Sequence, residues 1–317
     1  GIVNFSDIIV VSSSSSGANS EDIESIRFNA PRHFQRQGRC VTTSDYISAI
    51  LQNFPEVQHV NVFPGEIGNN SVEYGTVYIS PSTYSGTVLT LSRKADIETF
   101  LNGLNPIGIK VKVIDPDYLY IVLNSLIHVD FNKTTSSPSF IVSKAIATTK
   151  NFNIKYLQNM NTAFRMSKFE QAINDSDVGI LSNETTSKIY KVFNPDLDKP
   201  ITLRCDFSNS IKSSSVTSST FIFGGKTYTF TDYIKNANLT AGSIYLYEQN
   251  PNVLNYTKIG TIDYTHGIIN INQLSYHDIG GGIKIYAEPL SQDIYCYKNT
   301  IIEIDTVSGL NFTTISE

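Results

Sequence analysis

Two histidines in turn-like segments are the first candidates for metal chemistry. His266 and His277 are the only histidines within a dozen residues of each other, and Asp263 and Asp278 lie near them in the sequence. Imidazole and carboxylate groups are ligands for zinc and related ions. However, the ten residues between the two histidines match no standard zinc spacing. We therefore interpret them as turn histidines and expect no metal site.

Other patterns that could support catalysis lack the context that the chemistry needs. The run Gly280–Gly282 follows a turn and precedes a predicted strand, whereas a phosphate-binding loop joins a strand to a helix. The aspartates of Asp115–Asp117 and Asp196–Asp198 lie in turn sequences, where such side chains bond to the local backbone. No Gly-x-Ser-x-Gly motif is present. We expect no enzyme, no catalytic residue and no cofactor.

The three cysteines, Cys40, Cys205 and Cys296, are far apart in the sequence and form no Cys-x-x-Cys pair. None lies in a recognisable nucleophile motif or beside a histidine pair at a zinc spacing. This pattern predicts reduced thiols in a cytoplasmic environment.

Four arginines between residues 25 and 39 are the candidate interface residues: Arg27, Arg32, Arg36 and Arg39. A basic run of this kind could bind phosphate. The whole chain is acidic, however, with 24 Lys+Arg against 29 Asp+Glu and a net charge of −5. We favour the alternative, an extended arm whose arginines pair with carboxylates of this protein or of a partner.

Composition excludes several classes of protein. A chain of 317 residues with 40% hydrophobic residues can bury a core and is long enough for about two domains. The charged fraction of 17% is too low to attract nucleic acid or an anionic membrane, and the sequence carries neither a transmembrane run nor a signal peptide.

Because the sequence starts at Gly1 and reaches a strand-like run at Ile8–Val11 at once, we interpret it as a fragment of a longer polypeptide.

Two helices and four strands are predicted up to residue 131. The first helix is capped by Thr42, Thr43 or Ser44 and ends before Pro55, and the second is capped by Ser92. Their apolar positions at helical spacing are Ile47, Ile50, Leu51 and Phe54 in the first, and Ile97, Phe100, Leu101 and Leu104 in the second. The strands are Val57–Phe63, Tyr74–Ser80, Ile107–Val113 and Tyr118–Phe131. This order predicts a small α+β sandwich with both helices on one face of a mostly antiparallel sheet.

A smaller α/β unit is predicted next. Ser137-Pro138 begins a helix, and the capping box Ser167–Glu170 opens another that runs through Ile173. The unit closes near Asn194.

Beyond residue 199 the helical periodicity disappears and β-branched residues dominate. A Gly224-Gly225 turn predicts a hairpin that places Phe221 opposite Tyr228 and Phe223 opposite Lys226. A second hairpin is predicted to turn at Tyr264–Gly267, with Gly267 at positive φ. Further strands are expected at Ser243–Glu248, Gly282–Glu288 and Thr300–Thr306.

The predicted fold class is α+β: two small α/β sandwich units followed by an all-β C-terminal domain. The expected boundaries are 1–24 for an N-terminal strand and a flexible loop at Ser12–Gly17, 25–135 for the α+β domain, 136–198 for the smaller α/β unit, and 199–317 for an all-β sandwich-like domain.

The N-terminal motifs resemble a known family. An Asn29-Ala30-Pro31 arm precedes an Arg39-x-Val41-Thr42 turn and an Asp45-Tyr46 helix, and the strand at residues 74–80 continues the match. This pattern resembles the baseplate J-like family over roughly residues 20–195, and most of all the baseplate wedge proteins of T-even-type contractile-tailed bacteriophages, in their C-terminal half. Residues beyond about 200 resemble only the closer wedge relatives, and Cys40 stands where a small apolar residue is more usual.

The resemblance implies a structural role in a contractile phage tail baseplate. Such proteins link wedges into the ring around the central hub, associate with themselves as homodimers through this half, and bind other wedge subunits. The resemblance places the protein in the virion tail baseplate, after assembly in the host cytoplasm. We expect the arm Arg27–Arg39, with an exposed face of the α+β or β domain, to supply self-association.

An alternative of another class is a carbohydrate-binding β-sandwich module with an accessory α+β domain. The chain has 18 Tyr, and tyrosine rings on β faces stack on sugars, but it has no Trp. An enzyme with an unrecognised site is a third possibility.

Overall fold

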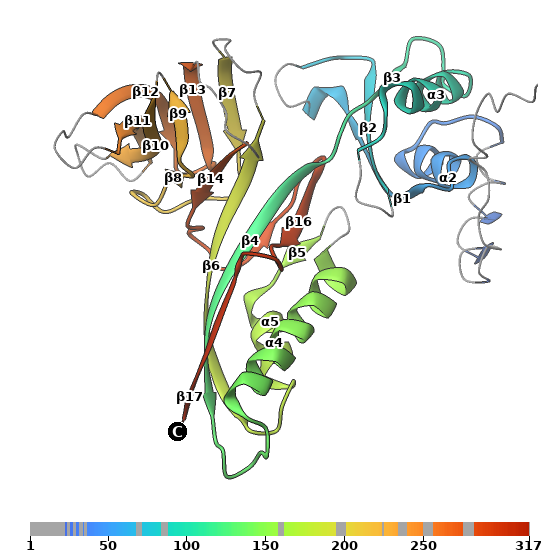
Figure 1. Cartoon of the computed structure of the whole chain (residues 1–317). Coiled ribbons are helices and arrows are strands. Elements are labelled where there is room, and N and C mark those ends of the chain that lie inside the picture. Colours follow the sequence, from blue (N-terminus) through green and yellow to red (C-terminus); the bar gives the residue numbers. More distant parts are fainter. Residues whose placement is uncertain are drawn as a thin grey trace, which may run out of the picture. The chain divides into compact units, whose positions relative to one another are not determined.

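The computed structural model describes residues 37–316 except 68–71, 84–87, 158–161, 195–200, 224, 234–239, 250–255 and 275–281, together with residues 23, 26, 27, 30, 31 and 34. The chain forms two compact units, of which the first ends at Pro116 and the second begins at Asp117 (Figure 1). The strand and loop expected within residues 1–22 lie outside the described residues.

The first unit is a three-stranded sheet with two helices. Its elements are α2 (Thr43–Asn53), β1 (Val57–Pro64), a 3₁₀ turn (Gly65–Ile67), β2 (Thr76–Thr83), α3 (Leu91–Asn102) and β3 (Lys110–Val113). This order confirms the predicted helix, strand, strand, helix, strand. The strand order is β1-β2-β3, in which β1 and β2 are antiparallel and β2 and β3 are parallel. The sheet is therefore mixed, whereas a mostly antiparallel sheet was expected.

The helix starts follow capping chemistry. Thr42, one of the three predicted candidates, caps α2: its hydroxyl accepts from the Asp45 N–H at 3.4 Å, and the Asp45 carboxylate accepts from the Thr42 N–H at 2.8 Å. The cap of α3 is Thr90, two residues before the predicted Ser92, because the Thr90 hydroxyl reaches the Arg93 N–H at 3.3 Å. Ile50, Ile97 and Leu101, predicted core positions, are fully buried. The helical periodicity therefore located the core face of both helices.

The second unit contains the remaining elements. They are β4 (Asp117–Val129), α4 (Pro138–Phe152), a π-helical turn (Asn153–Leu157), β5 (Ala163–Phe164), α5 (Met166–Asn174), β6 (Ile180–Phe193), β7 (Ile201–Asp206), β8 (Thr217–Ser218), β9 (Phe221–Phe223), β10 (Lys226–Tyr233), β11 (Ala241–Glu248), β12 (Tyr256–Asp263), β13 (Ile268–Leu274), β14 (Ile283–Ala287), β15 (Ile294–Tyr295), β16 (Thr300–Ile304) and β17 (Leu310–Ser316).

Strand β4 belongs to this second unit, which corrects the expected boundary at residue 135. It pairs with β6 in antiparallel register and with β16 and β17 in parallel register, along its other edge. Alternate residues of β4, including Leu119, Ile121 and Ile127, are fully buried. The 13 residues of β4 are paired by the long β6 along one edge and by the two C-terminal strands along the other.

Helices α4 and α5 lie along one face of the β4–β6–β17 ribbon (Figure 1). As predicted, α4 begins at Pro138 with Ser137 as its cap. The capping box predicted at Ser167 is absent: the N-cap of α5 is Arg165, two residues earlier, and it makes no side-chain capping bond. Instead, the Met166 N–H donates to the Asp293 carboxylate at 3.1 Å, so a residue far along the chain satisfies the helix start.

The β-rich part of the second unit confirms both predicted hairpins. In the β9–β10 hairpin, Phe221 lies opposite Tyr228 and Phe223 opposite Lys226. In the β12–β13 hairpin, Asp263 pairs with Ile268 across a turn in which Gly267 has φ +67°. A Cβ atom added at Gly267 would lie 2.1 Å from the Asn209 carbonyl oxygen, so only glycine fits at this position.

The expected all-β sandwich domain from residue 199 is not confirmed. One sheet runs β16-β4-β6-β14-β8-β10-β11-β12-β13-β7, and its strands β14 and β16 pair with β6 and β4 instead of closing a second sheet. A single hydrophobic core extends from Leu119 and Ile141 through Phe230 to Phe312. A mixed α+β fold is therefore confirmed, whereas the description as two small sandwich units and an all-β domain is not.

The three cysteines are buried, and none of them forms a disulfide. Burial raises the pKa of the Cys205 thiol to about 12, which makes this thiol a poor nucleophile. In the described part of the chain, no helix has the length and hydropathy needed to cross a membrane.

A buried carboxylate fixes the loops beside α4. The Asp177 side chain accepts from the Lys144 ammonium at 2.7 Å, the Ser136 hydroxyl at 3.0 Å and the Gly179 N–H at 2.9 Å. The hydrogen bond from Lys144, followed by that from Gly179, holds the pKa of Asp177 well below its ordinary value.

We predict that Asp177→Asn lowers the free energy of unfolding by about 1.5–3 kcal/mol at neutral pH, because it removes a charge-assisted network. The Asp177 pKa is lower in the folded than in the unfolded chain, where it is about 3.9, so the stabilisation is complete above about pH 5 and shrinks as the pH falls below this value toward the folded-state pKa. Urea unfolding of both proteins between pH 3 and 8 measures the difference. An equal loss in the exposed control Asp175→Asn, or a difference that grows as the pH falls from 5 to 3, would contradict it.

Candidate interaction surfaces

The structure describes two of the four arm arginines. Arg27 and Arg39 are exposed, whereas Arg32 and Arg36 lie outside the described residues. The next residue, Cys40, is buried, and its N–H donates to the Leu104 carbonyl at 2.9 Å. This bond fixes the end of the arm on the first unit.

The histidine pair forms no described metal site. His266 is an exposed turn residue whose Nδ1 lies 2.8 Å from the Asp263 carboxylate. That hydrogen bond lowers the pKa of Asp263, which also accepts from the Thr265 and His266 N–H groups. His277 and Asp278 lie outside the described residues. Among the residues that the structure places, no group of three His, Cys, Asp or Glu side chains could hold a metal ion.

Tyrosines from three neighbouring strands form a row that we call the tyrosine face. Tyr120 on β4 lies directly opposite Tyr190 on β6, which lies opposite Tyr286 on β14. Their ring centroids are 4.9 and 5.1 Å apart, and Tyr118 stacks on Tyr120 at 6.1 Å. Because Leu119 and its alternate neighbours on β4 are the fully buried ones, these tyrosines occupy the opposite side of the sheet.

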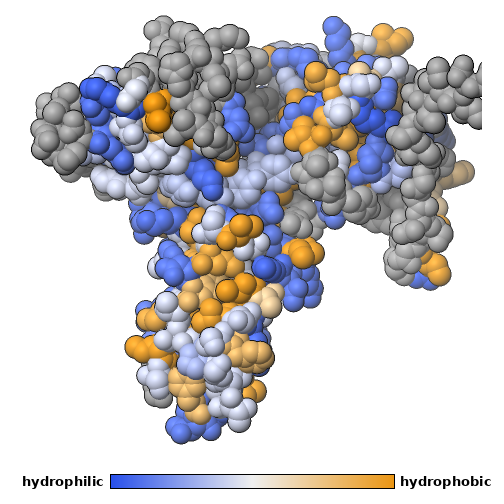
Figure 2. Space-filling view, in the orientation of Figure 1, coloured by the Kyte–Doolittle hydropathy of each residue, from blue (hydrophilic) through white to orange (hydrophobic). Residues whose placement is uncertain are grey.

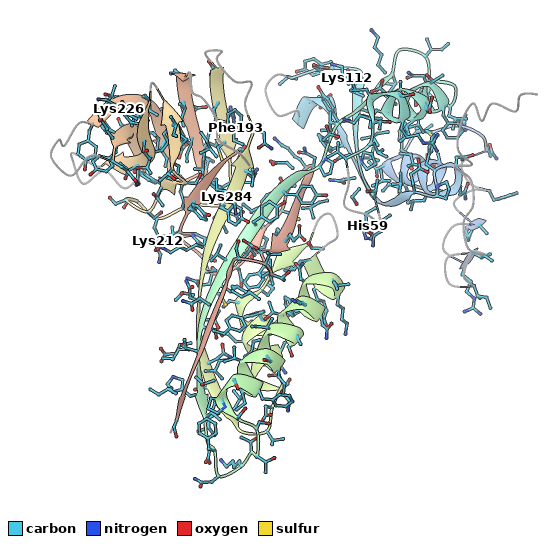
Figure 3. All side chains as sticks on the ribbon, viewed as in Figure 1. His59, Lys112, Phe193, Lys212, Lys226 and Lys284 are labelled. Atoms are coloured by element: carbon cyan, nitrogen blue, oxygen red, sulfur yellow. The ribbon has the colours of Figure 1, made fainter. Side chains whose placement is uncertain are left out.

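Charged groups border the tyrosine face. The Lys284 ammonium lies 4.8 Å from the Tyr190 ring centroid, and Figure 3 shows Lys284 beside β6. The Tyr190 hydroxyl donates to the Asp305 carboxylate at 3.0 Å. Burial, and then Asp305, raise the pKa of Tyr190 far above its ordinary value, so this hydroxyl remains a donor. Tyrosine is enriched at protein interfaces, and the Lys284 ammonium is attracted to the face of the Tyr190 ring.

The outer side of α4 and its π-helical turn form a second exposed surface, which we call the α4 face. Phe140, Ile154 and Tyr156 are 53%, 64% and 46% exposed. Figure 2 shows hydrophobic residues at the surface of the part of the second unit that carries α4 and α5. Residues 138–157 contain three lysines and no Asp or Glu. This face is therefore apolar and basic within an acidic chain.

A segment that we call the strap, residues 289–299, ties the helices to the β-rich part. The Asp293 carboxylate lies 2.6 Å from the Arg165 guanidinium, which also stacks over the Tyr295 ring at 4.7 Å. On its other side, the Tyr295 backbone N–H and carbonyl both bond to the Asn209 amide at 2.9 Å. The strap thus joins the start of α5 to the loop after β7.

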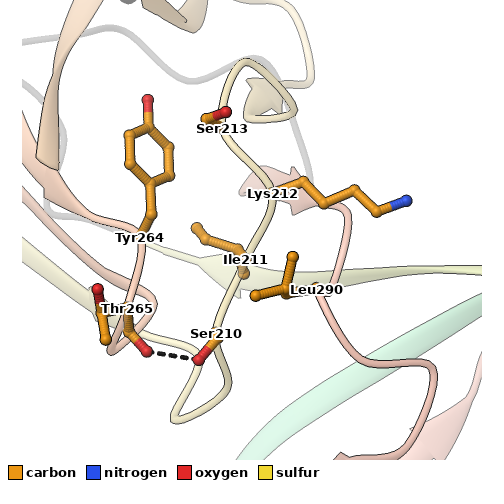
Figure 4. Close-up of a pocket in the computed structure, with 7 residues that line it drawn as sticks. All are labelled: Ser210, Ile211, Lys212, Ser213, Tyr264, Thr265 and Leu290. Carbon is orange, nitrogen blue, oxygen red and sulfur yellow. Dashed lines mark hydrogen bonds between the residues drawn. The ribbon is translucent and has the colours of Figure 1, made fainter. Parts of the chain in front are cut away.

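A hollow of about 430 Å³ lies beside the strap (Figure 4). Its lining residues are Ser210, Ile211, Lys212, Ser213, Tyr264, Thr265 and Leu290. The Ser210 hydroxyl donates to the Thr265 carbonyl at 2.6 Å, and the Tyr264 hydroxyl donates to Asp232 at 2.8 Å. Lys212 is its sole titratable group apart from the buried Tyr264, so the hollow lacks a general acid–base pair.

Family models match both compact units. Residues 42–114 match the baseplate structural protein gp6, C-terminal domain I, and residues 117–192 match its C-terminal domain III. The two matches meet where the first unit ends and the second begins. Both models describe C-terminal domains of a baseplate structural protein.

A relative is the baseplate wedge protein gp6 of Enterobacteria phage T4, 27% identical over 208 residues. The matched region covers 65% of this chain and 31% of that protein, so the match spans about a third of the relative's length. The predicted resemblance to the C-terminal region of baseplate wedge proteins is therefore confirmed.

Sequence reasoning found the arm but missed the tyrosine face and the α4 face. The alternation Tyr118-Leu119-Tyr120-Ile121 signals one aromatic and one aliphatic side of β4, but it does not identify the neighbouring strands. The absence of acidic residues from 138–157 was the available signal for the α4 face.

We predict that Asp293→Ala lowers the free energy of unfolding by about 0.5–2 kcal/mol, because Met166 loses its capping acceptor. Amide hydrogen exchange should accelerate in the strap and in the first turn of α5. Asp293→Asn, which keeps an acceptor oxygen but loses the charge, should retain most of the protection, since the half-exposed ion pair with Arg165 contributes little. Equal acceleration in both variants would show that the ion pair, and not the cap, holds the strap.

Proposed function

We propose that this chain is a structural component of a contractile phage tail baseplate, which links wedges into the ring around the central hub. Linking occurs through self-association as a homodimer and through contacts with other wedge subunits. The observation that carries the proposal is that the tandem matches to two C-terminal domains of a baseplate structural protein cover both compact units. The location that follows is the virion tail baseplate, with assembly in the host cytoplasm.

The two kinds of surface suit different contacts. The tyrosine face is part of a sheet with a continuous core on its other side, so it is a rigid platform suited to contacts that must persist under load. Of the arm arginines, Arg27 and Arg39 are exposed, and contacts between exposed charges weaken with ionic strength. We assign stable contacts to the tyrosine face and switchable self-association to the arm.

Catalysis forms no part of the proposed function. The T4 relative is named as a baseplate wedge protein, and the hollow beside the strap lacks paired acid and base groups. The carbohydrate-binding alternative gains no support from Tyr190, at the centre of the tyrosine face. Tyr190 is 4% exposed, and its ring is covered by Tyr120, Tyr286 and Lys284, so it offers a sugar no open ring face.

We predict that the chain self-associates and that the double variant Arg27→Glu, Arg39→Glu raises the dissociation constant about tenfold at low salt, through lost charge complementarity. Light scattering after size exclusion, at several concentrations and two salt levels, measures the mass. The matched control Lys258→Glu reverses an exposed charge on β12 and should leave the mass unchanged. An unchanged mass in the double variant would remove the arm arginines from the interface, and a strict monomer in the parent chain would contradict self-association through this region.

A further inference from the structure

We propose that β17 (Leu310–Ser316) of one copy pairs in antiparallel register with β17 of a second copy, so that two β4–β6–β17 ribbons join into one sheet. This inference rests on the proposed self-association and names a surface that carries it. The partner is a second copy of this chain, and the contact consists of backbone hydrogen bonds between two sheet edges.

Strand β17 lies at an edge of the second unit (Figure 1). It pairs in parallel with β4, from Leu310 opposite Leu123 to Ser316 opposite Val129. Among the residues that the structure places, β17 has no other strand partner. Its outer edge therefore presents a row of backbone N–H and C=O groups that another strand can bind.

One hydrogen bond shows which residues of β17 face outward with their backbone. The Leu123 N–H donates to the Gly309 carbonyl at 2.8 Å, and in a parallel ladder alternate residues bond to a given neighbour. Every second residue from Asn311 to Ile315 therefore turns its backbone groups toward β4. The other residues of the strand turn theirs outward: Leu310, Phe312, Thr314 and Ser316.

The composition of β17 permits pairing with itself. Its sequence, Leu-Asn-Phe-Thr-Thr-Ile-Ser, contains no charged residue and no proline, and its ladder with β4 has a regular register. Charged residues, prolines and bulges are the usual devices that protect an edge strand from further pairing. Two other edge strands carry such charges: Lys110 and Lys112 on β3, and Arg204 and Asp206 on β7. Strand β17 lacks this protection.

The length of β17 selects the register. A twofold axis at Thr313, the middle residue, pairs all seven residues of one strand with those of its copy. Phe312 then lies opposite Thr314, and Leu310 lies opposite Ser316. These are the residues whose backbone groups face outward, so both members of each pair can exchange hydrogen bonds. At the axis Thr313 meets Thr313, a favourable cross-strand pair.

This contact stops at two copies. Each copy contributes the same edge, so the joined sheet has the order β6-β4-β17-β17-β4-β6 and neither β17 keeps a free edge. The other edge of the ribbon is less suited to pairing, because β6 carries exposed Glu184 along the stretch that faces β4. Pairing of β17 with that edge of another copy would also leave a free edge for a further copy. The structure therefore favours a discrete dimer.

A proline at an outward residue of β17 tests backbone pairing in the full chain. Thr314→Pro removes an N–H that points away from β4 and puts the proline ring in the path of the partner strand. We expect the dimer dissociation constant, measured by sedimentation velocity, to rise at least about tenfold. The fold should survive because no bond with β4 is lost, and urea unfolding at a concentration where the parent chain is monomeric checks this.

A charge at the twofold axis tests the register. Thr313→Lys and Thr313→Glu, each alone, place like charges opposite each other and should raise the dissociation constant about fivefold. A 1:1 mixture of these two variants should form a dimer again, because opposite charges then meet at the axis. The matched controls Thr186→Lys and Thr186→Glu introduce the same charges at an exposed position of β6 and should leave the dimer unchanged, alone and mixed.

The outcomes separate the two proposals. A parent chain that is monomeric at every concentration overturns the proposed self-association and this contact with it. A parent dimer that Thr314→Pro does not weaken overturns the β17 contact alone and leaves self-association standing. If the proline weakens the dimer but the mixture of Thr313 variants does not recover, β17 does not meet its own copy at Thr313, and the twofold contact is overturned.

Discussion

The antiparallel pairing of β4 with β6 is the constraint on which the second unit depends. One side of β4 carries Leu119, Ile121 and Ile127 toward the core, and the other carries the first residues of the tyrosine face. The edges of this pair are then completed by β16 and β17 on one side and β14 on the other. Because these strands come from the C-terminal end of the chain, the ribbon is complete only when the chain has returned from the β-rich part. A single core follows, and no separate C-terminal domain forms.

Local chemistry could be predicted from the sequence, and long-range partners could not. The cap of α2 and the hairpins at residues 224–225 and 264–267 depend on residues within one turn of each other; both hairpins were predicted correctly, and the cap was narrowed to three residues that include Thr42. The pattern of residues 118–131 indicated a strand, but alternation does not identify a partner, so β4 was assigned to the wrong sheet. The start of α5 was misassigned for the same reason, since its acceptor Asp293 is more than a hundred residues away. For the candidate surfaces, the arm arginines could be identified from the sequence. The outward orientation of Phe140 on α4 and of Ile154 on its π-helical turn could be identified only from their exposure in the structure.

A continuous core with charged outer surfaces fits a part that must carry load. Packing inside the second unit resists deformation, because close-packed interiors have low compressibility. Contacts through Arg27 and Arg39 of the arm, as proposed, depend on exposed charges and can be remade without unfolding either unit. The same chain can therefore keep its shape while its neighbours change.

The measurement that tests the central role of the β4–β6 pair most directly is native-state hydrogen exchange, followed by mass spectrometry at increasing, sub-denaturing urea concentrations. We predict that peptides from β4, β6, β14 and β16 lose protection together, with one opening free energy, because none of these strands keeps its partners without the others. If β14 and β16 exchanged with β11 and β12 in an earlier step while β4 and β6 stayed protected, the C-terminal strands would be dispensable, and the pairing of β4 with β6 would not unite the second unit.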